Sequence, residues 1–208
     1  MIRPGTVPGV VFGTASDGDA RRDERARRRL SAAAGVVPDW AWMRQVHGAT
    51  VVCATAAGVL GEADAAYTKV PGLPLAVGTA DCFPIVLVGD GIVGIAHAGW
   101  RGAADGVVRT LRAAMTAAGG APNAAAIGPG IGPCCFEVGA EVAARLPGCE
   151  ALTTWGTMSV DLRRAIRRDL AGLDVWVAES CTMSDDGFHS YRRNGTTERQ
   201  VTVAWIPD

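Results

Sequence analysis

The pattern of hydrophobic and polar positions is clearest in the middle of the chain, where two short apolar runs lie on either side of a Gly-Asp-Gly triplet. The runs cover residues 83–88 and 92–96, and both are rich in Ile and Val. Such runs separated by a Gly/Asp pair are typical of a β-hairpin. We therefore predict two antiparallel strands joined by a two-residue loop, either Gly89-Asp90 or Asp90-Gly91.

The position of this loop decides which polar side chains meet at the far end of the hairpin. With Gly89-Asp90 as the loop, Cys82 lies opposite His97. With Asp90-Gly91, Cys82 faces Gly99 and becomes a diagonal neighbour of His97 on the same face. Direct cross-strand partners have Cβ atoms about 5 Å apart, so a thiolate and an imidazole can share a metal ion or a proton. A three-residue loop would put the two on opposite faces.

The rest of the chain alternates between predicted strands and amphipathic or charged helices. Residues 63–77 are predicted as a turn-rich approach to the hairpin. No repeat or linker interrupts the pattern, so we expect residues 1–208 to form a single domain. The predicted strands are residues 10–12, 40–53 with a break at Gly48, 124–127, 174–178, 188–193 and 200–205, and the predicted helices are residues 17–34, 103–118, 137–146 and 161–171.

Composition narrows the class of protein. Hydrophobic residues make up 49% of the chain, which is enough for a sizeable core, and the formal net charge of −1 argues against a dedicated nucleic-acid partner. No apolar run reaches the roughly 18 residues that span a bilayer, and the N-terminus lacks a signal-peptide pattern, so we expect no membrane partner and a cytoplasmic protein. The six cysteines are then expected as free thiols or ligands.

Several polar residues admit both a structural and a functional interpretation. The arginines between residues 21 and 29 are interpreted mainly as a solvated helix face rather than as an anion patch. The vicinal pair Cys134-Cys135 is interpreted as structural, because adjacent side chains usually point apart in a strand or a helix. Asp64 and Asp81 are each either turn residues or acceptors that hold a histidine ring.

Positive charge is expected around the end of the hairpin. A helix that starts just after it would aim its N-terminal N–H groups near Cys82 and His97, which favours an anion. Arg101 adds a charge suited to phosphate or carboxylate. Arg192 and Arg193 are candidates for a second clamp, although only one of them can face a pocket from a strand.

A metal bound by Cys82 and His97 needs a third ligand. The chain has only three histidines, so the candidates are His47 and His189, and a histidine beside a glycine, as His47 is, is more often structural. Two His and one Cys with an open position are typical of catalytic zinc, which acidifies a bound water or polarises a ligand oxygen. The metal-free alternative is a Cys82 thiolate activated by His97. These residues alone leave both alternatives open.

Six segments, in this order along the chain from about residue 40 to the C-terminus, resemble the YfiH/laccase-domain family. Its members have been called multicopper polyphenol oxidase, purine nucleoside phosphorylase and peptidoglycan editing factor. Together the segments are highly specific for the family. They are RQVHG (residues 44–48), TADCFPIVL (79–87), AHAGWRG (96–102), IGPGIGPCCFEVG (127–139), CT (181–182) and FHSYRRNG (188–195).

The resemblance implies a fold, a metal and an activity. The fold is α+β, with mixed β-sheets covered by helices. The family's zinc ligands correspond to His47, Cys82 and His97, which selects His47 over His189. The implied activity is phosphorolysis of adenosine, inosine and methylthioadenosine, with adenosine deamination in addition.

We therefore expect a zinc-dependent purine nucleoside phosphorylase and adenosine deaminase whose small-molecule partners are a purine nucleoside and phosphate. His47, Cys82 and His97 are the expected metal and catalytic residues, and the expected substrate-binding residues are Arg44, Arg101 and Arg192.

Three alternatives accompany this expectation. A copper phenol oxidase could use the same ligands, but a multicopper centre needs far more than three histidines. A Cys-His hydrolase or amidase in peptidoglycan editing would use Cys82 without a metal. A non-catalytic, zinc-stabilised protein that binds a nucleotide-linked cell-wall precursor is the third, because only Gly13–Gly18 stands where the family usually carries a longer Gly/Ser/Asn-rich segment.

Overall fold

The hairpin at the centre of the chain has the second of the two predicted registers. In the computed structural model, which describes residues 1–207, strand β7 (Phe83–Gly89) pairs antiparallel with β8 (Ile92–Ala98). Phe83 lies opposite Ala98 and Gly89 opposite Ile92, so the loop is Asp90-Gly91. Gly91 has φ 63°, in the left-handed region that glycine adopts at low cost. The two-residue loop puts Cys82 and His97 on the same face, as predicted.

The hairpin lies within a mixed six-stranded sheet. The strand order is β12-β9-β7-β8-β5-β3. The pairs β12–β9 and β3–β5 are parallel, and the others are antiparallel. The other four strands of this sheet are β3 (Val51–Cys53), β5 (Ala65–Thr68), β9 (Pro122–Ile127) and β12 (Asp174–Val177).

A second mixed sheet of five strands packs against the first. Its order is β1-β13-β6-β2-β4, with β2 parallel to both of its neighbours and the remaining pairs antiparallel. A separate two-stranded ribbon, β10–β11, lies apart from both sheets. The strands are β1 (Val10–Phe12), β2 (Ala41–Arg44), β4 (Gly58–Glu62), β6 (Leu75–Thr79), β13 (Gln200–Ala204), β10 (Glu150–Leu152) and β11 (Met158–Val160).

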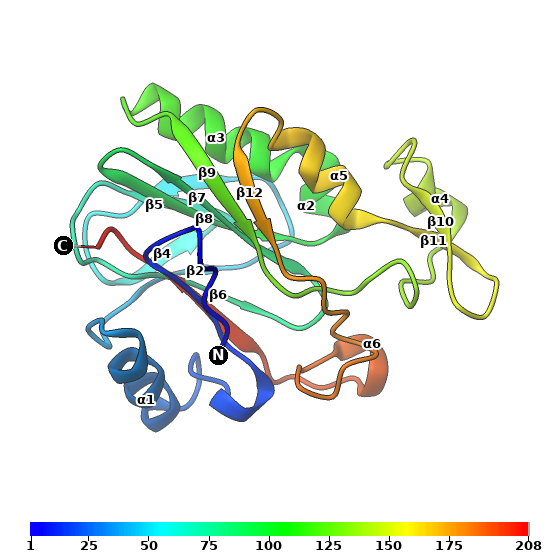
Figure 1. The fold of residues 1–208 in the computed structure, drawn as a ribbon, viewed down its shortest axis with the longest axis horizontal. Coiled ribbons are helices and arrows are strands. Elements are labelled where there is room, and N and C mark those ends of the chain that lie inside the picture. Colours follow the sequence, from blue (N-terminus) through cyan, green and yellow to red (C-terminus); the bar gives the residue numbers. More distant parts are fainter. Residues whose placement is uncertain (208) are drawn as a thin grey trace.

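Helices cover the outer faces of both sheets (Figure 1). Helices α3 and α5 lie on the six-stranded sheet, and α1 lies on the five-stranded sheet. The result is the expected α+β fold, with two mixed sheets between helical layers. The helices are α1 (Glu24–Ala34), α2 (Trp100–Asp105), α3 (Val107–Ala117), α4 (Ala140–Ala143), α5 (Leu162–Asp169), α6 (Tyr191–Asn194) and a 3₁₀ turn, η1 (Ala15–Asp17).

The alternation of side chains along the hairpin separates two cores and places the candidate site. Ile85 and Leu87 pack with the helices on the outer face, whereas Val86 and Ile95 belong to the core between the sheets. Successive side chains of a strand point to opposite faces, so His97 continues the series of Ile95 toward the second sheet. The hairpin thus directs His97 to the space between the sheets, at the end of its strand.

Several predicted helices differ from those observed. The first begins at Glu24 rather than at residue 17, because the Asp23 carboxylate caps it, and it ends at Gly35 as predicted. The helix predicted at residues 103–118 is two helices, α2 and α3, separated by Gly106 with φ 80°. Of the helix predicted at residues 137–146, only α4 is helical, and α5 and its Asp161 cap agree with the prediction.

Two predictions about strands were wrong. The segment predicted as a turn-rich approach, residues 63–77, contains β5 and the start of β6, which is buried along its whole length at the centre of its sheet. Residues 188–193 are not a strand, because Ser190 caps the short helix α6, which ends at Gly195 with φ 67°. No helix within residues 1–207 is long and apolar enough to cross a membrane.

Candidate active site and metal centre

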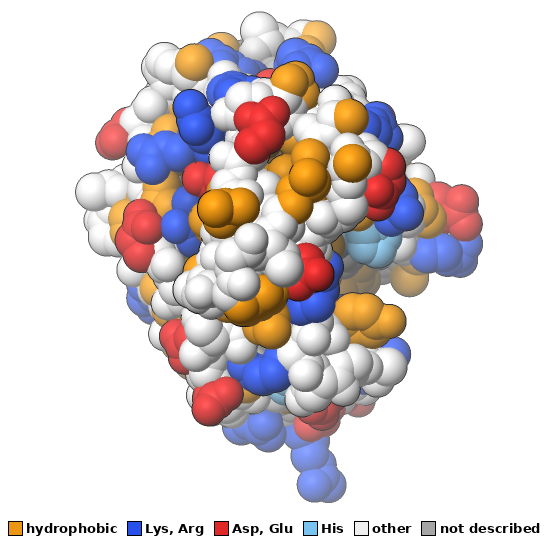
Figure 2. Space-filling view, turned by 90° about the vertical axis from the view of Figure 1, so that its right-hand side faces the viewer, with side chains coloured by type: hydrophobic (Ala, Val, Ile, Leu, Met, Phe, Trp, Pro, Cys, Tyr) orange, Lys and Arg blue, Asp and Glu red, His pale blue; other side chains and the backbone are white. Residues whose placement is uncertain are grey.

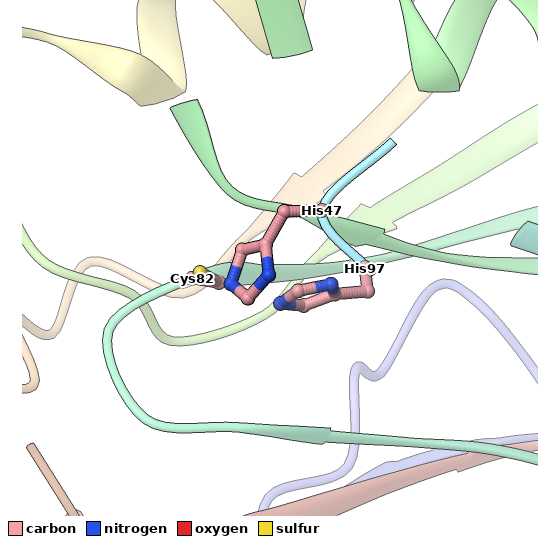
Figure 3. A group of neighbouring side chains, drawn as sticks. All are labelled: His47, Cys82 and His97. Carbon is pink, nitrogen blue, oxygen red and sulfur yellow. The ribbon is translucent and has the colours of Figure 1, made fainter. Parts of the chain in front are cut away.

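Three side chains from separate segments converge where the two sheets meet. His47 follows β2 of the five-stranded sheet, Cys82 precedes β7, and His97 lies in β8 (Figure 3). One ligand atom from each lies within 4.8 Å of the others. The two imidazole rings meet edge to face, with their centroids 4.8 Å apart. The structure therefore brings together Cys82 and His97, which the hairpin pattern pairs, and His47, which the family resemblance selects.

Asp64 holds both histidines in place. Its Oδ1 lies 2.8 Å from Nδ1 of His97, and both side chains are buried. The same carboxylate accepts hydrogen bonds from the backbone N–H groups of His47 at 3.0 Å and Gly48 at 2.6 Å. These bonds lower the pKa of Asp64 against the opposing effect of burial, so it remains ionised. Of the two aspartates considered from sequence, Asp64 is the one that orients a histidine ring.

His47 shapes the site through its backbone, and Gly99 shapes it through the small size of its side chain. His47 has φ 63°, a conformation that non-glycine residues seldom adopt and that the Asp64 carboxylate stabilises here. A Cβ on Gly99 would lie 2.9 Å from the Cys82 sulfur and 3.1 Å from Cδ2 of His47. Glycine at position 99 therefore leaves the room in which the His47 and Cys82 side chains meet.

The electrostatics favour a thiolate beside an imidazolium. Burial opposes the ionisation of Cys82, but the charge of His97 and hydrogen bonds from His47 and His97 outweigh it and lower the pKa of Cys82 to about 6. Burial likewise disfavours a charged His97, yet the Cys82 charge and the bond to Asp64 raise its pKa to about 9. The pair is therefore charged at neutral pH in the absence of a metal.

The same donor set fits a metal ion. Two imidazole nitrogens and one sulfur are typical ligands of a catalytic zinc site with an open position. Asp64 occupies Nδ1 of His97 and leaves Nε2 available, which is the arrangement in which a carboxylate orients a ligating histidine. His189 lies outside this group, with its Nδ1 3.7 Å from Glu198.

These residues line a large cleft with a volume of about 810 Å³. Figure 2 shows one face of the molecule. At the right of this view, pale-blue histidine surface is set back between hydrophobic and basic side chains. Its apolar lining includes Trp42, Val59, Ile131, Phe136 and Tyr191. Its basic lining consists of Arg21, Arg27, Arg44, Arg192 and Arg199. The cleft thus combines flat apolar surfaces with a concentration of positive charge.

The three arginines predicted to bind substrate have different positions. Arg44 and Arg192 line the cleft, and Arg192 lies over the Phe136 ring, 5.2 Å from its centroid. Arg101 is exposed on α2, stacks on Trp100 and is not among the residues that line the cleft. Arg193 donates to backbone carbonyls of the surrounding loop and serves the structure.

Sequence reasoning missed three arginines of the cleft. Arg21 and Arg27 were interpreted as part of a solvated helix face, yet both line the cleft, and Arg21 precedes the helix. The prediction of a solvated face holds for Arg28, which pairs with Glu24 on the exposed side. Arg199 gave no sequence signal, because only the return of β13 alongside β6 places it there.

A second cysteine group was also missed. The sulfur atoms of Cys134, Cys135 and Cys181 all lie within 4.8 Å of one another. The vicinal pair was interpreted as structural on the premise of a strand or helix, but the two residues lie in a turn. Burial opposes ionisation of Cys181, but the Gly132 N–H and groups of Ser184 and Met183 lower its pKa to about 7.

Comparisons with known proteins agree with this structure. Residues 8–207 match the sequence model of the family described as multi-copper polyphenol oxidoreductase laccase. A protein of Deinococcus radiodurans named purine nucleoside phosphorylase is 39% identical over 220 residues, which cover 99% of this chain and 85% of that protein. One of Corynebacterium glutamicum with the same name is 38% identical over 197 residues, or 87% of this chain and 80% of that protein.

Solved structures show the same fold. YlmD from Geobacillus stearothermophilus superposes with a TM-score of 0.86 at 31% identity, covering 97% of this chain and 93% of that one. The hypothetical protein YfiH from Bacillus licheniformis gives 0.80 at 26% identity, covering 90% and 82%. The match over residues 8–207, together with relatives that share more than a third of their residues along the chain, shows that this chain belongs to the multi-copper polyphenol oxidoreductase laccase family, the YfiH family.

Proposed function

We propose that the protein is a zinc-dependent purine nucleoside phosphorylase acting on adenosine, inosine and methylthioadenosine, with adenosine deaminase activity. The observation that carries the proposal is the convergence of His47, Cys82 and His97 in an arginine-lined cleft. The names of the relatives support the reaction class. We infer a cytoplasmic location, because the six free thiols suit a reducing compartment.

His47, Cys82 and His97 would hold the zinc ion. When bound, zinc supplies Lewis acidity that lowers the pKa of water or polarises a ligand oxygen. The contribution of Asp64 is to hold the His97 ring through Nδ1 and to fix the backbone at His47 and Gly48. The distances among the ligands are thus set by the folded chain before any metal binds.

The arginines of the cleft are suited to bind phosphate. In phosphorolysis, a phosphate oxygen forms a bond to the anomeric carbon of the ribose as the bond from that carbon to the purine nitrogen breaks. Phosphate is strongly anionic, so cations must hold it beside the sugar. Arg44, Arg192 and Arg199 line the cleft and are the residues we assign to this role.

The apolar part of the cleft is suited to bind the purine base. Trp42, Phe136 and Tyr191 present aromatic rings along the lining, and flat bases stack well on such rings. Gln45 also lines the cleft, but its side-chain amide is already hydrogen-bonded to the backbone of Gly78. Its Nε2 donates to the Gly78 carbonyl, and its Oε1 accepts from the Gly78 N–H. We therefore assign base binding to the aromatic rings and give Gln45 a structural role.

The test uses one purified preparation whose metal content is determined by mass spectrometry. Adenosine and inosine are then followed by chromatography, with and without phosphate. We expect one zinc per chain and release of free base that depends on phosphate, both lost in Cys82→Ala. Cys53→Ala is the matched control, because Cys53 is an exposed free thiol on β3 outside the cleft.

The other outcomes separate the alternatives. If the protein contains zinc but releases no free base in the presence of phosphate, the result contradicts phosphorylase activity and favours a zinc-stabilised binding protein. Arg199→Gln, which leaves the three metal-binding side chains in place, is expected to raise the KM for phosphate by about tenfold or more, the loss of one charged hydrogen bond. An unchanged KM removes Arg199 from the phosphate site.

A Cys-His hydrolase or amidase is the second candidate, and the charged Cys82–His97 pair favours it. In this reaction the thiolate would attack an amide carbonyl, and His97 would protonate the leaving amine. Such an enzyme keeps or gains amidase activity on cell-wall peptide fragments after the metal is chelated. Loss of all turnover on chelation, restored by zinc, contradicts it.

A further inference from the structure

The three-thiol cluster, Cys134, Cys135 and Cys181, lies outside the cleft and has no part in the proposed reaction. None of the three lines the cleft. Cys135 is buried, and Cys134 and Cys181 are partly exposed, so a small ion can reach the sulfur atoms from solvent. No carboxylate or imidazole within residues 1–207 belongs to the group. We propose that this cluster is a binding site for a single thiophilic cation, with Cu(I) as its preferred ion.

The backbone brings the three sulfurs together. The N–H groups of Cys135 and Phe136 both donate to the Gly132 carbonyl, which forms a tight turn. In this turn the Cys134 and Cys135 sulfurs lie 3.3 Å apart, although adjacent side chains would diverge in a strand or helix. Cys181 arrives from the segment after β12, where it forms a parallel bridge with Gly130.

The turn is held at several points, so the cluster does not depend on a bound ion for its shape. Thr154 donates its N–H to the Cys134 carbonyl at 2.9 Å, and the Ser159 hydroxyl donates to the Pro133 carbonyl at 2.7 Å. The Gly132 N–H donates to the Cys181 sulfur at 3.1 Å. These contacts join the turn to the β10–β11 ribbon on one side and to the Cys181 segment on the other.

The spacing and the donor type indicate the ion. A metal with sulfur ligands at about 2.3 Å holds a trigonal set of sulfurs about 4.0 Å apart. The three sulfurs here all lie within 4.8 Å of one another, and those of Cys134 and Cys135 are 3.3 Å apart, so small shifts would form such a set. Thiolates without nitrogen or oxygen partners select soft ions such as Cu(I). Structural zinc is almost always bound by four ligands, and this cluster supplies three.

The test separates this site from the one in the cleft. The full chain carrying Cys82→Ser, reduced and freed of metal under anaerobic conditions, is titrated with Cu(I) in competition with a chromogenic Cu(I) chelator. We expect one Cu(I) per chain. Adding Cys181→Ser should weaken binding at least tenfold, whereas adding Cys53→Ser, at an exposed thiol on β3, should leave it unchanged.

X-ray absorption of the Cys82→Ser protein loaded with Cu(I) needs no further variant and should show three sulfur neighbours. Failure to compete with the chelator overturns the proposal. An unchanged affinity for Cu(I) after Cys181→Ser also overturns it. So does an absorption spectrum with two sulfur neighbours, because the vicinal pair Cys134-Cys135 alone would then bind the ion. Tighter binding of zinc than of Cu(I) in the same competition overturns the choice of ion. Because the Cys82→Ser background lacks one of the proposed zinc ligands, these outcomes do not depend on the proposed function.

Discussion

Asp64 is the residue on which the geometry of the candidate metal centre most depends. Its carboxylate contacts His97 Nδ1 and accepts hydrogen bonds from the backbone N–H groups of Val46, His47 and Gly48. Asp64→Asn therefore removes the charge and replaces one acceptor oxygen with an N–H donor. We expect metal affinity to fall about 10- to 100-fold, as is usual when a ligating histidine loses its carboxylate partner. Competition with a zinc chelator measures this.

Asp19 provides the control for Asp64, because it is also buried but pairs with Arg21. Asp19→Asn should leave the zinc affinity unchanged. An Asp64→Asn protein that binds zinc as tightly as the wild type would show that the ring of His97 is held by its surroundings alone.

Gly99 tests whether the space between the ligands matters. Its φ of −77° is open to any residue, so Gly99→Ala acts through its Cβ, which would meet the Cys82 sulfur at 2.9 Å. We expect weaker zinc binding with little loss of unfolding free energy. The comparison is Gly5→Ala, because a Cβ at Gly5 meets nothing within 4 Å. Equal zinc affinity in Gly99→Ala would show that the ligands tolerate displacement.

The ionisation of Cys82 predicts a pH dependence in the metal-free protein. Because the pKa of Cys82 is lowered to about 6, the thiolate forms as the pH rises through that value, well below the ordinary thiol pKa of about 8.5. The rate of alkylation at Cys82, followed by mass spectrometry of its peptide, should have its midpoint near pH 6. In His97→Gln the midpoint should move upward, since the imidazolium charge is lost. A midpoint near 8.5 in the wild type would contradict the charged pair.

At the level of the element, the turn of the hairpin sets the register that brings Cys82 and His97 to one face. Gly91 has φ 63°, so Gly91→Ala forces a side chain into the left-handed region and should lower the unfolding free energy by about 1–2 kcal/mol. Urea denaturation measures the change. Asp90→Ala, at an exposed position of the same loop, should stay within about 0.5 kcal/mol of the wild type. Equal stability of the two variants would mean that the turn relaxes.

On the scale of the whole molecule, the candidate metal centre joins the two sheets. His47 follows a strand of one sheet and His97 lies in the other, so an ion bound only by the folded state stabilises their packing. Zinc at 100 times its Kd should add about 2.7 kcal/mol. For a chain of this size, that raises the Tm by about 5–10 °C. Calorimetry with and without a chelator measures the shift, which Cys82→Ser should abolish. If zinc does not change the Tm of the wild type, the result contradicts binding at this site.

Local chemistry was enough to predict the parts of the fold that depend on it. The β-branched runs and the Gly/Asp loop predicted the hairpin, and Gly35 the end of α1. The two-residue loop put Cys82 and His97 on one face because side chains alternate along strands. The resemblance, rather than the spacing, singled out His47 over His189.

Features that depend on contacts between segments far apart in the chain were decided only by the tertiary structure. Strand β6, short and rich in small residues, is a strand because its neighbours pair with it on both sides. Arg199 lines the cleft because β13 returns to β6, and Cys181 meets the Cys134-Cys135 turn through its bridge to Gly130. Periodicity and turn chemistry act over a few residues and so can be read from the sequence, whereas these juxtapositions join residues far apart in the chain and arise only when the sheets and loops pack.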